Sequence, residues 1–293
     1  MTENEFLLND RIAKIQSIIN MYGAENFALS FSGGKDSTVL HYLIDMAIPN
    51  NTIPRIYADT GIELSMVRDF VYNMKETDPR IFIIKPQTPI KKMLENEGYP
   101  FKSKFHAHIL DVYQRKGLTQ TSRKYLGLPT DDKKTYCVER TCPKILRYQF
   151  HGGLNFRVSD KCCVRLKENP LDDWKKEHNI KYDIIGVMAD EGGRRINAKC
   201  LAFRGDKLKA FQPLAVVSKE WETWFISEYN IKICDIYKSP YNFVRTGCKG
   251  CPFSKSLKNE LEQLKLYFPN EYKQCELIWK PVYKEYRRIG YRL

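Results

Sequence analysis

The chain has 293 residues, 43% of them hydrophobic and 13% aromatic, which argues against a disordered polypeptide and allows one sizeable core. No stretch has the ~18 uncharged apolar residues that a membrane span needs, and MTENEFLLND lacks the pattern of a secretory signal, so we expect a cytoplasmic protein without membrane contact. The net charge of +13 favours a polyanionic partner or an anionic substrate such as a nucleotide, with a lysine-rich surface as the plain alternative.

Three strand-to-helix pairs follow a predicted N-terminal helix that stops at Gly23. The expected strands are NFALSFS, RIYADTG and RIFIIKP, and the helices after them are TVLHYLIDMAI, ELSMVRDFVYNMKET and PIKKMLENEG. This alternation within about 80 residues predicts parallel βαβ units, and YDIIGVMAD at 182–190 is expected to join the same sheet. The predicted fold class is α/β, with a doubly wound and mostly parallel sheet.

The remaining segments are mostly helical in pattern. Residues 106–118 and 139–150 have helical spacing, and Ser218 is expected to cap an amphipathic helix, SKEWETWFISEYN. The loop TGCKGCPFS comes next along the chain. A helical C-terminal region follows it at 256–290, with breaks near Pro269 and Pro281.

The first strand runs directly into FSGGKDS at 31–37. A glycine pair at a strand-to-helix turn lets the backbone approach a bound anion, and the free N–H groups of the next helix then face that anion. Ser32, Ser37 and Thr38 add hydroxyl donors, and Lys35 adds a positive charge. The pattern predicts a phosphate-binding loop that differs from the Walker A motif, whereas a plain turn is the alternative.

SGGKDS resembles the pyrophosphate loop (PP-loop) of the adenine nucleotide alpha-hydrolase-like superfamily, and within it the phosphoadenosine phosphosulfate (PAPS) reductase family. Further segments resemble that family in the same order, over about residues 25–255. They are ADTGIE at 58–63, CCVRLKENPL at 162–171, GGRRINA at 192–198, FQPLAVVSKEWETWFI at 211–226 and GCKGC at 247–251. The resemblance implies three segments: an N-terminal helix at 1–22, a nucleotide-binding domain at 23–255 and a helical tail at 256–293.

The resemblance also implies which residues bind the nucleotide. The PP-loop would hold the pyrophosphate part of ATP or another adenylyl nucleotide, with Lys35 neutralising charge and Asp36 orienting the loop or a metal such as Mg²⁺. In that family the Asp-Thr-Gly motif lines the nucleotide pocket. The predicted nucleotide-binding residues are Ser32, Gly33, Gly34, Lys35, Asp36, Ser37, Asp59, Thr60 and Gly61.

Arg194 and Arg195 follow a strand end and two glycines. Two guanidiniums there suit bidentate binding of phosphate or sulfate, and the family's Gly-x-Arg-Arg segment grips that end of its substrate. Surface salt bridges are the alternative. Asp59, at the end of another strand, could bind ribose, the adenine edge or Mg²⁺, or could simply cap a helix together with Thr60.

Four of the nine cysteines form two pairs, Cys162 with Cys163 and Cys248 with Cys251. Four thiolates could hold a [4Fe–4S] cluster or close a zinc site, although adjacent cysteines are unusual for structural zinc, and buried thiols are the third option. The resemblance to adenylylsulfate reductases implies a [4Fe–4S] cluster, with Lys167 offsetting its charge; a solvent-facing lysine is the alternative. The candidate catalytic residues are Lys35, Asp36, Lys167, Arg194 and Arg195.

The other cysteines and the histidine pair are expected to be structural. Cys137 and Cys142 have a spacing that fits neither a zinc knuckle nor a redox pair, so core thiols are favoured over a second ligand pair. Cys200 and Cys234 also look structural. His106 and His108 would lie on different faces of a helix, which disfavours a metal site. The residues in this group are Cys137, Cys142, Cys200, Cys234, His106 and His108.

The chain departs from sulfonucleotide reductases at its C-terminal end. Those enzymes use a cysteine on a mobile tail within Glu-Cys-Gly-Leu/Ile-His, and nothing here matches it. Cys275 lies in YKQCELIWK, inside a predicted helix. The basic and aromatic YKEYRRIGYRL fits contact with nucleic acid or a partner better than a redox arm.

Three functions remain open, in order of preference. The first is an enzyme that binds ATP, acts at its α-phosphate and releases pyrophosphate in sulfur transfer, as in nucleic-acid phosphorothioation. The second is a thioredoxin-dependent adenylylsulfate or PAPS reductase. The third is a non-catalytic iron–sulfur module that binds nucleotide or nucleic acid. The expected partners are an adenine nucleotide, DNA or another nucleic acid, and a cysteine desulfurase or a thioredoxin-like protein.

Overall fold

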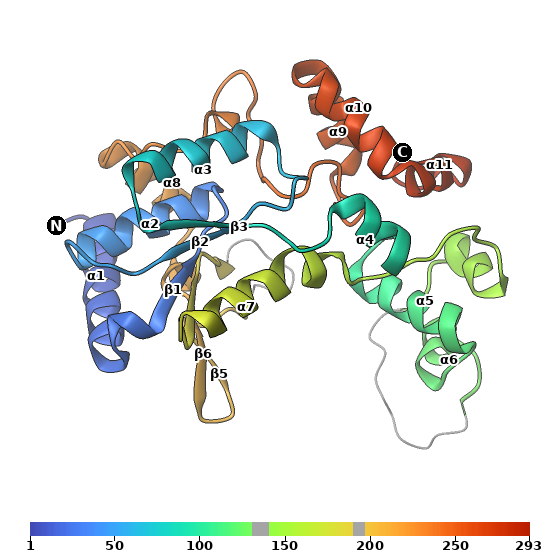
Figure 1. Cartoon of the computed structure of the whole chain (residues 1–293), viewed down its shortest axis with the longest axis horizontal. Coiled ribbons are helices and arrows are strands. Elements are labelled where there is room, and N and C mark those ends of the chain that lie inside the picture. The colour runs from blue at the N-terminus through green and yellow to red at the C-terminus, as the bar shows by residue number, and fades with distance from the viewer. Residues whose placement is uncertain (131–140, 190–196) are drawn as a thin grey trace. The chain divides into compact units, whose positions relative to one another are not determined.

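The computed structural model describes residues 1–130, 141–189 and 197–293 of the chain (Figure 1). These residues form two compact units, each made of two chain segments. Unit 1 comprises Met1–Pro86 and Asn169–Thr246, and unit 2 comprises Gln87–Glu168 and Gly247–Leu293. The division into an N-terminal helix, a domain at 23–255 and a tail at 256–293 stays a prediction.

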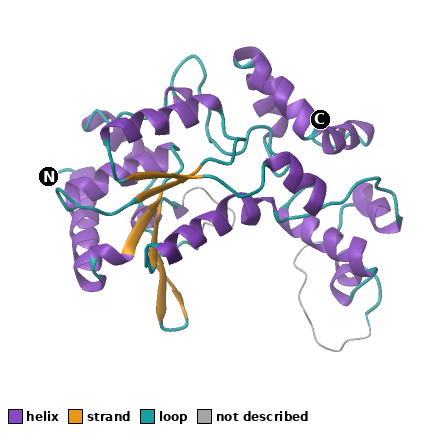
Figure 2. Cartoon of the chain, viewed as in Figure 1, coloured by secondary structure: helices purple, strands orange, loops and turns teal. Residues whose placement is uncertain are grey.

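Unit 1 contains a sheet that has six strands within the described residues, in the order β3-β2-β1-β4-β6-β5 (Figure 2). All neighbouring strands run parallel except β5, which is antiparallel to β6. The mostly parallel α/β sheet predicted from the sequence is therefore confirmed, and the fourth strand expected in it is present and lies beside the first. The strands are β1 Phe27–Ser30, β2 Arg55–Ala58, β3 Ile81–Ile84, β4 Tyr182–Ile185, β5 Leu201–Arg204 and β6 Lys207–Phe211.

Helices cover both faces of this sheet. In Figure 1, α2 and α3 lie over one face and α7 over the other, which is the doubly wound arrangement. Phe27 and Leu29 of β1 are fully buried, as are Leu40 and Ile44 of α2, because a parallel strand between two helical layers has no solvent face. The unit 1 helices are α1 Glu3–Tyr22, α2 Lys35–Ala47, α3 Ser65–Thr77, α7 Asn169–Glu177 and α8 Lys219–Glu228, with short 3₁₀ turns at Ala24–Asn26, Pro213–Val216 and Asp235–Tyr237.

Unit 2 is built from helices. They are α4 Ile90–Glu97, α5 Lys104–Lys116, α6 Gln120–Leu126, a 3₁₀ helix Lys144–His151, a π-helical turn Val164–Glu168, α9 Leu257–Tyr267, α10 Pro269–Ile278 and α11 Lys280–Arg288. The breaks expected in the C-terminal region are present, because Pro269 begins α10 and Pro281 lies in the first turn of α11. None of the helices described is both long enough and apolar enough to cross a membrane.

Local signals explain most element boundaries. Gly23 ends α1 with a φ of 81°, and the Ser218 hydroxyl accepts a hydrogen bond from the backbone N–H of Trp221 at 3.2 Å, as a helix cap should. Two expectations were wrong or incomplete. The helix expected at 139–150 begins only at Lys144, after Pro143, and the hairpin of β5 and β6 was not predicted.

Candidate functional site

The turn between β1 and α2 has the shape expected of an anion-binding loop. Gly33 has a φ of 68°, and a Cβ atom placed on it would lie 2.5 Å from the Cγ2 atom of Val71. Both the backbone angle and the space therefore require glycine at this position. Gly34 is the N-cap of α2, so the free N–H groups of the first helical turn open at the loop.

Hydroxyl groups hold this turn in place. The Ser37 hydroxyl accepts a hydrogen bond from the Ser32 N–H at 3.2 Å and donates to the Gly34 carbonyl at 2.9 Å. The Ser32 hydroxyl in turn accepts from the Gly34 N–H at 3.3 Å. Thr38 is fully buried and donates to the Gly34 carbonyl at 2.9 Å. Its hydroxyl thus shapes the loop, which corrects the expectation that it would offer a donor to the anion.

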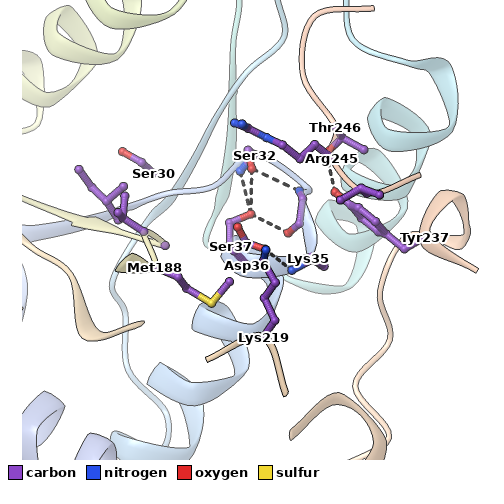
Figure 3. Close-up of a pocket in the computed structure, with 15 residues that line it drawn as sticks. Ser30, Ser32, Lys35, Asp36, Ser37, Met188, Lys219, Tyr237, Arg245 and Thr246 are labelled. Carbon is purple, nitrogen blue, oxygen red and sulfur yellow. Dashed lines mark hydrogen bonds and ion pairs between the residues drawn. The ribbon is translucent and has the colours of Figure 1, made fainter. Parts of the chain in front are cut away.

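A cavity of about 380 Å³ lies against the loop, at the carboxyl ends of β1 and β4 (Figure 3). Crevices at this edge of parallel sheets are the usual ligand sites of α/β folds. A Cβ atom on Gly186, just after β4, would lie 3.1 Å from the Asp36 carbonyl, so the two segments approach closely. The lining residues are Ser30, Ser32, Gly34, Lys35, Asp36, Ser37, Ile185, Gly186, Val187, Met188, Lys219, Tyr237, Val244, Arg245 and Thr246.

Cations dominate the charge of the cavity wall, with Lys35, Lys219 and Arg245 against Asp36. The Lys35 ammonium lies 2.8 Å from an Asp36 carboxylate oxygen and also contacts the carboxylate of Glu222. Burial alone would lower the pKa of Lys35, but its hydrogen bonds to Asp36 and Glu222 outweigh that effect and raise it. Lys35 is therefore charged, and in this structure two carboxylates share its charge.

Several residues of this site were missed by sequence reasoning. Tyr237 and Thr246 are joined by a hydroxyl–hydroxyl hydrogen bond of 2.5 Å (Figure 3), and a Cβ atom on Gly34 would lie 3.3 Å from each of them. The segment that carries Arg245 therefore lies against the loop and forms part of the cavity wall. Its only signal in the sequence is its position directly before GCKGC. The missed residues are Lys219, Glu222, Tyr237, Arg245 and Thr246.

The Asp59–Thr60–Gly61 segment forms a tight turn after β2. The Asp59 carboxylate accepts hydrogen bonds from the Gly61 N–H at 3.2 Å and from the Tyr72 hydroxyl at 2.8 Å. Thr60 donates to the Glu63 carboxylate at 2.8 Å. The N-cap of α3 is Leu64, so the idea that Asp59 or Thr60 caps this helix was wrong. The turn lies at the same sheet edge as the loop, because β1 and β2 are parallel neighbours, but it does not line the cavity.

Arg194 and Arg195 fall outside the described residues, as does Cys137. Their predicted roles stay predictions.

Unit 2 contains all four cysteines of the two predicted pairs. A hydrogen bond from Cys162 lowers the pKa of Cys163 to about 6, and the charges of Lys104 and Lys167 act in the same direction. Burial raises the pKa of Cys251 to about 12, and the nearby thiols of Cys248 and Cys163 contribute. The charges of these thiols thus act on one another across the chain, although Cys163 and Cys248 are 85 residues apart.

Cations accompany the first cysteine pair. Lys167 lies in the π-helical turn Val164–Glu168, which begins directly after Cys163. Lys104, at the start of α5, lies 3.6 Å from the Glu168 carboxylate. Burial would lower the pKa of Lys104, but the charges of Cys163 and Glu168 raise it. The sequence reasoning named Lys167 and missed Lys104, which is distant along the chain.

The C-terminal helices hold the second cysteine pair. The Trp279 indole N–H donates to the Lys249 carbonyl at 3.0 Å, and the Tyr286 hydroxyl donates to the Pro252 carbonyl at 3.0 Å. The Tyr283 hydroxyl donates to the Gly250 carbonyl. Three aromatic side chains thus fix the backbone of the loop that carries Cys248 and Cys251.

Cys275 is fully buried in α10, and its burial raises the pKa of its thiol to about 12. It packs under the same loop, since a Cβ atom on Gly250 would lie 2.9 Å from its sulfur. A buried, protonated thiol on a packed helix is a poor nucleophile. Its place in the structure is that of a core residue.

The remaining candidates occupy structural positions. His106 is fully buried between the Tyr125 hydroxyl, at 2.9 Å, and the Gln149 side-chain oxygen, at 2.8 Å. His108 is exposed and lies 3.4 Å from Asp160. The other cysteines that the structure describes are buried or half-buried single thiols: Cys142, Cys200 and Cys234.

Comparison with known proteins identifies one domain. Residues 26–130 match the family model of the phosphoadenosine phosphosulfate reductase domain. The resemblance predicted from SGGKDS and ADTGIE is thus confirmed over this part of the chain, which contains a PAPS reductase-like PP-loop domain.

Individual proteins add less. A stretch of 70 residues is 35% identical to a vacuolar membrane protease of Candida albicans and covers 24% of this chain, but only 8% of that protein's length. The structure of PAPS reductase from Candida auris in a phosphate complex aligns with a TM-score of 0.44 and 11% identity, over 80% of this chain and 91% of the other. The U34-tRNA thiolase NcsA from Methanococcus maripaludis, with its [4Fe-4S] cluster, aligns with a TM-score of 0.42 and 18% identity. The alignment covers 98% of this chain and 80% of the thiolase chain. Similarity at this level carries no argument about activity.

Proposed function

We propose that this chain binds ATP or another adenylyl nucleotide at the Ser32–Ser37 loop and acts at its α-phosphate in a sulfur-transfer reaction. The carrying observation is the loop itself, a glycine-dependent turn that opens the N-terminus of α2 onto a cavity lined by three cations. Free N–H groups and a positive helix end bind phosphate without further adaptation. The match of residues 26–130 to the PAPS reductase domain supports this assignment.

The residues around the cavity suit a reaction that releases pyrophosphate. When an acceptor oxygen attacks the α-phosphorus, a new P–O bond forms and the bond to the β-phosphate breaks. The departing charge would be stabilised by the loop N–H groups together with Lys35, Lys219 and Arg245. Asp36 would orient the loop or a Mg²⁺ ion.

Two further groups complete the proposed nucleotide site. Asp59, Thr60 and Gly61 are proposed to contact the nucleoside from the neighbouring strand end. Arg194 and Arg195 are proposed to hold the far end of the substrate.

A [4Fe–4S] cluster fits the donor set of unit 2. Cys162, Cys163, Cys248 and Cys251 lie in one unit, and the loop that carries Cys248 and Cys251 is fixed by hydrogen bonds from the C-terminal helices. A cation near the pair, as Lys167 provides, favours thiolate over thiol. When bound, such a cluster would supply electrons or carry sulfur. We propose these four cysteines as its ligands, with Lys167 offsetting its charge.

The acceptor that we propose is a nucleic acid, DNA included, which the net charge of +13 supports. The sulfur would then come from a partner such as a cysteine desulfurase. A thioredoxin-dependent adenylylsulfate or PAPS reductase is the second candidate, favoured by the two cysteine pairs. Such a reductase needs a reachable nucleophilic cysteine, and the buried Cys275 does not supply one.

The experiment that separates these functions compares two products from protein purified without oxygen. Pyrophosphate is measured after incubation with ATP and Mg²⁺, with and without DNA. Sulfite is measured after incubation with adenylylsulfate or PAPS and reduced thioredoxin. We expect pyrophosphate, and its loss in K35A. Sulfite at enzyme-like rates would reverse the order of the two candidates, and neither product would favour a non-catalytic binding module.

A further inference from the structure

Glu222 lies beside the nucleotide loop but comes from a distant part of the chain, the segment FQPLAVVSKEWETWFI at 211–226. It is in the first turn and a half of α8, where its side chain is 2% exposed and its carboxylate contacts the Lys35 ammonium. Glutamate is rarely buried to this extent unless it has a specific partner. The burial therefore indicates that this carboxylate acts on Lys35.

The contact leaves Glu222 incompletely satisfied. Within the part of the chain that the structure describes, its Oε1 atom is buried and has no hydrogen-bond partner. Such an oxygen costs free energy because it has given up water without a replacement. The charged groups that act on Glu222 are Lys35 and Asp36 of α2, and Lys219 lies three residues before it on its own helix. A second acid is thus held here at a cost, although Asp36 already pairs with Lys35 at 2.8 Å.

Two carboxylates around one ammonium change the local charge that an incoming anion encounters. Lys35 lines the cavity, and it is the loop's own cation. Burial and the charge of Asp36 raise the pKa of Glu222 to about 7. Above that pH both acids are ionised, and the group of three then carries a net negative charge, which opposes a phosphate at this distance. An anion must therefore compete with Glu222 for Lys35.

We propose that Glu222 is a positioning residue that holds the Lys35 ammonium between two carboxylates in the unliganded protein, so that a bound phosphate must draw Lys35 away from it. The inference rests on the proposed function, since it concerns the same anion site. Through Glu222, α8 would hold Lys35 back from the anion site and so weaken the binding of any anion there. Phosphate affinity would then be set partly from outside the PP-loop motif.

The test measures binding of inorganic pyrophosphate to the full chain by calorimetry. E222Q keeps the shape of the side chain and removes its charge, and we expect the dissociation constant to fall about tenfold because Lys35 is released. E222D keeps the charge but withdraws it by one methylene, so a smaller gain is expected. E220Q is the matched control, because Glu220 lies on the same helix and is exposed, and its affinity should equal that of the wild type.

A gain in affinity cannot come from structural damage, which would weaken binding. Melting curves of each variant check the fold. In a K35Q background, adding E222Q should raise the affinity less than it does in the wild type, because only the direct repulsion between Glu222 and the anion is left to remove. The inference would be overturned if folded E222Q bound pyrophosphate no more tightly than the wild type. It would also be overturned if E222Q raised the affinity equally in the wild-type and K35Q backgrounds. In both cases the anion site itself would stand. Absence of pyrophosphate binding in both wild type and E222Q would overturn the anion site and the inference together.

Discussion

Gly33 determines the shape of the anion loop more directly than its neighbours do. It combines a φ of 68° with a site where a Cβ atom would lie 2.5 Å from Val71. Gly205, in the β5–β6 turn, has a φ of 60° but no atom within 4 Å of such a Cβ. A side chain at Gly205 would meet backbone strain alone, whereas a side chain at Gly33 would meet backbone strain and a steric clash. Comparing substitutions at the two glycines therefore separates the two effects.

We expect G33A to be destabilised more than G205A. Both variants pay about 1 kcal/mol for a left-handed alanine, and G33A must also displace Val71. Pyrophosphate binding should be lost in G33A and kept in G205A. Chemical denaturation and calorimetry measure the two effects, and equal loss of stability and binding in both variants would contradict the steric argument.

His106 makes the stability of the protein sensitive to acid. Burial lowers the pKa of its imidazole to about 4, so the folded protein holds it neutral between Tyr125 and Gln149. The unfolded chain binds the proton near pH 6.5. Because the unfolded state then holds more protons, stability falls as the pH drops from 6.5 to 4.

Replacing His106 by Gln should make this part of the pH profile of the unfolding free energy less steep. Burial also lowers the pKa of His41 to about 4, so His41 keeps its share of the slope. Between the two pKa values, the loss of unfolding free energy that His106 causes is at most about 3 kcal/mol, and H106Q should avoid it. H108Q is the control, because His108 is exposed on the same helix. An unchanged slope in H106Q would show that another group governs acid unfolding.

The C-terminal helices act as a support for the cysteine loop. Tyr283 and Tyr286 of α11 donate hydrogen bonds to the carbonyls of Gly250 and Pro252. Removing the Tyr283 hydroxyl takes away its hydrogen bond to the Gly250 carbonyl, which costs about 1–3 kcal/mol. The Pro252 carbonyl also accepts a hydrogen bond from Arg292 at 2.7 Å, so removing the Tyr286 hydroxyl costs less. Without these hydrogen bonds, we expect the backbone that carries Cys248 and Cys251 to shift.

Y283F and Y286F should therefore lower the iron content of protein purified without oxygen, and the double variant should lower it further. Y272F is the comparison on α10, because its hydroxyl bonds the partly exposed Glu276 rather than the loop. Iron and acid-labile sulfide are assayed per chain. Full iron content in the double variant would show that the cysteine loop does not depend on this support.

At the scale of the molecule, the sequence predicts what is local and misses what folding brings together. The four strands β1 to β4, α1 and the loop were predictable, because hydrophobic spacing, Gly23 and the Gly33–Gly34 pair encode them within a few residues, whereas the β5–β6 hairpin was not. Glu222 and Arg245 were not, since they reach the loop from more than 180 residues away. Glu222 lies in the 211–226 segment, but nothing in that segment marks it as a partner of Lys35. Lys104 was missed for the same reason.

Two distinct sets of residues build the two candidate sites. Among the residues that the structure describes, those lining the loop cavity all belong to unit 1, and the four paired cysteines all belong to unit 2. The chain passes from the cavity wall at Thr246 to Cys248 with one residue between them. We nevertheless expect that one site can be damaged while the other is kept, because each unit has its own internal contacts.

C163S should therefore lose most of its iron while it binds pyrophosphate within about twofold of the wild type, since a cysteine outside the unit adds little to the anion field. K35Q should bind pyrophosphate at least tenfold more weakly, because the loop's own cation is gone, and keep its full iron content. Iron analysis and calorimetry on the same preparations give both numbers. Loss of both properties in either variant would mean that the two sites depend on each other for folding, and the proposed enzyme would then couple nucleotide and cluster through structure rather than through chemistry alone.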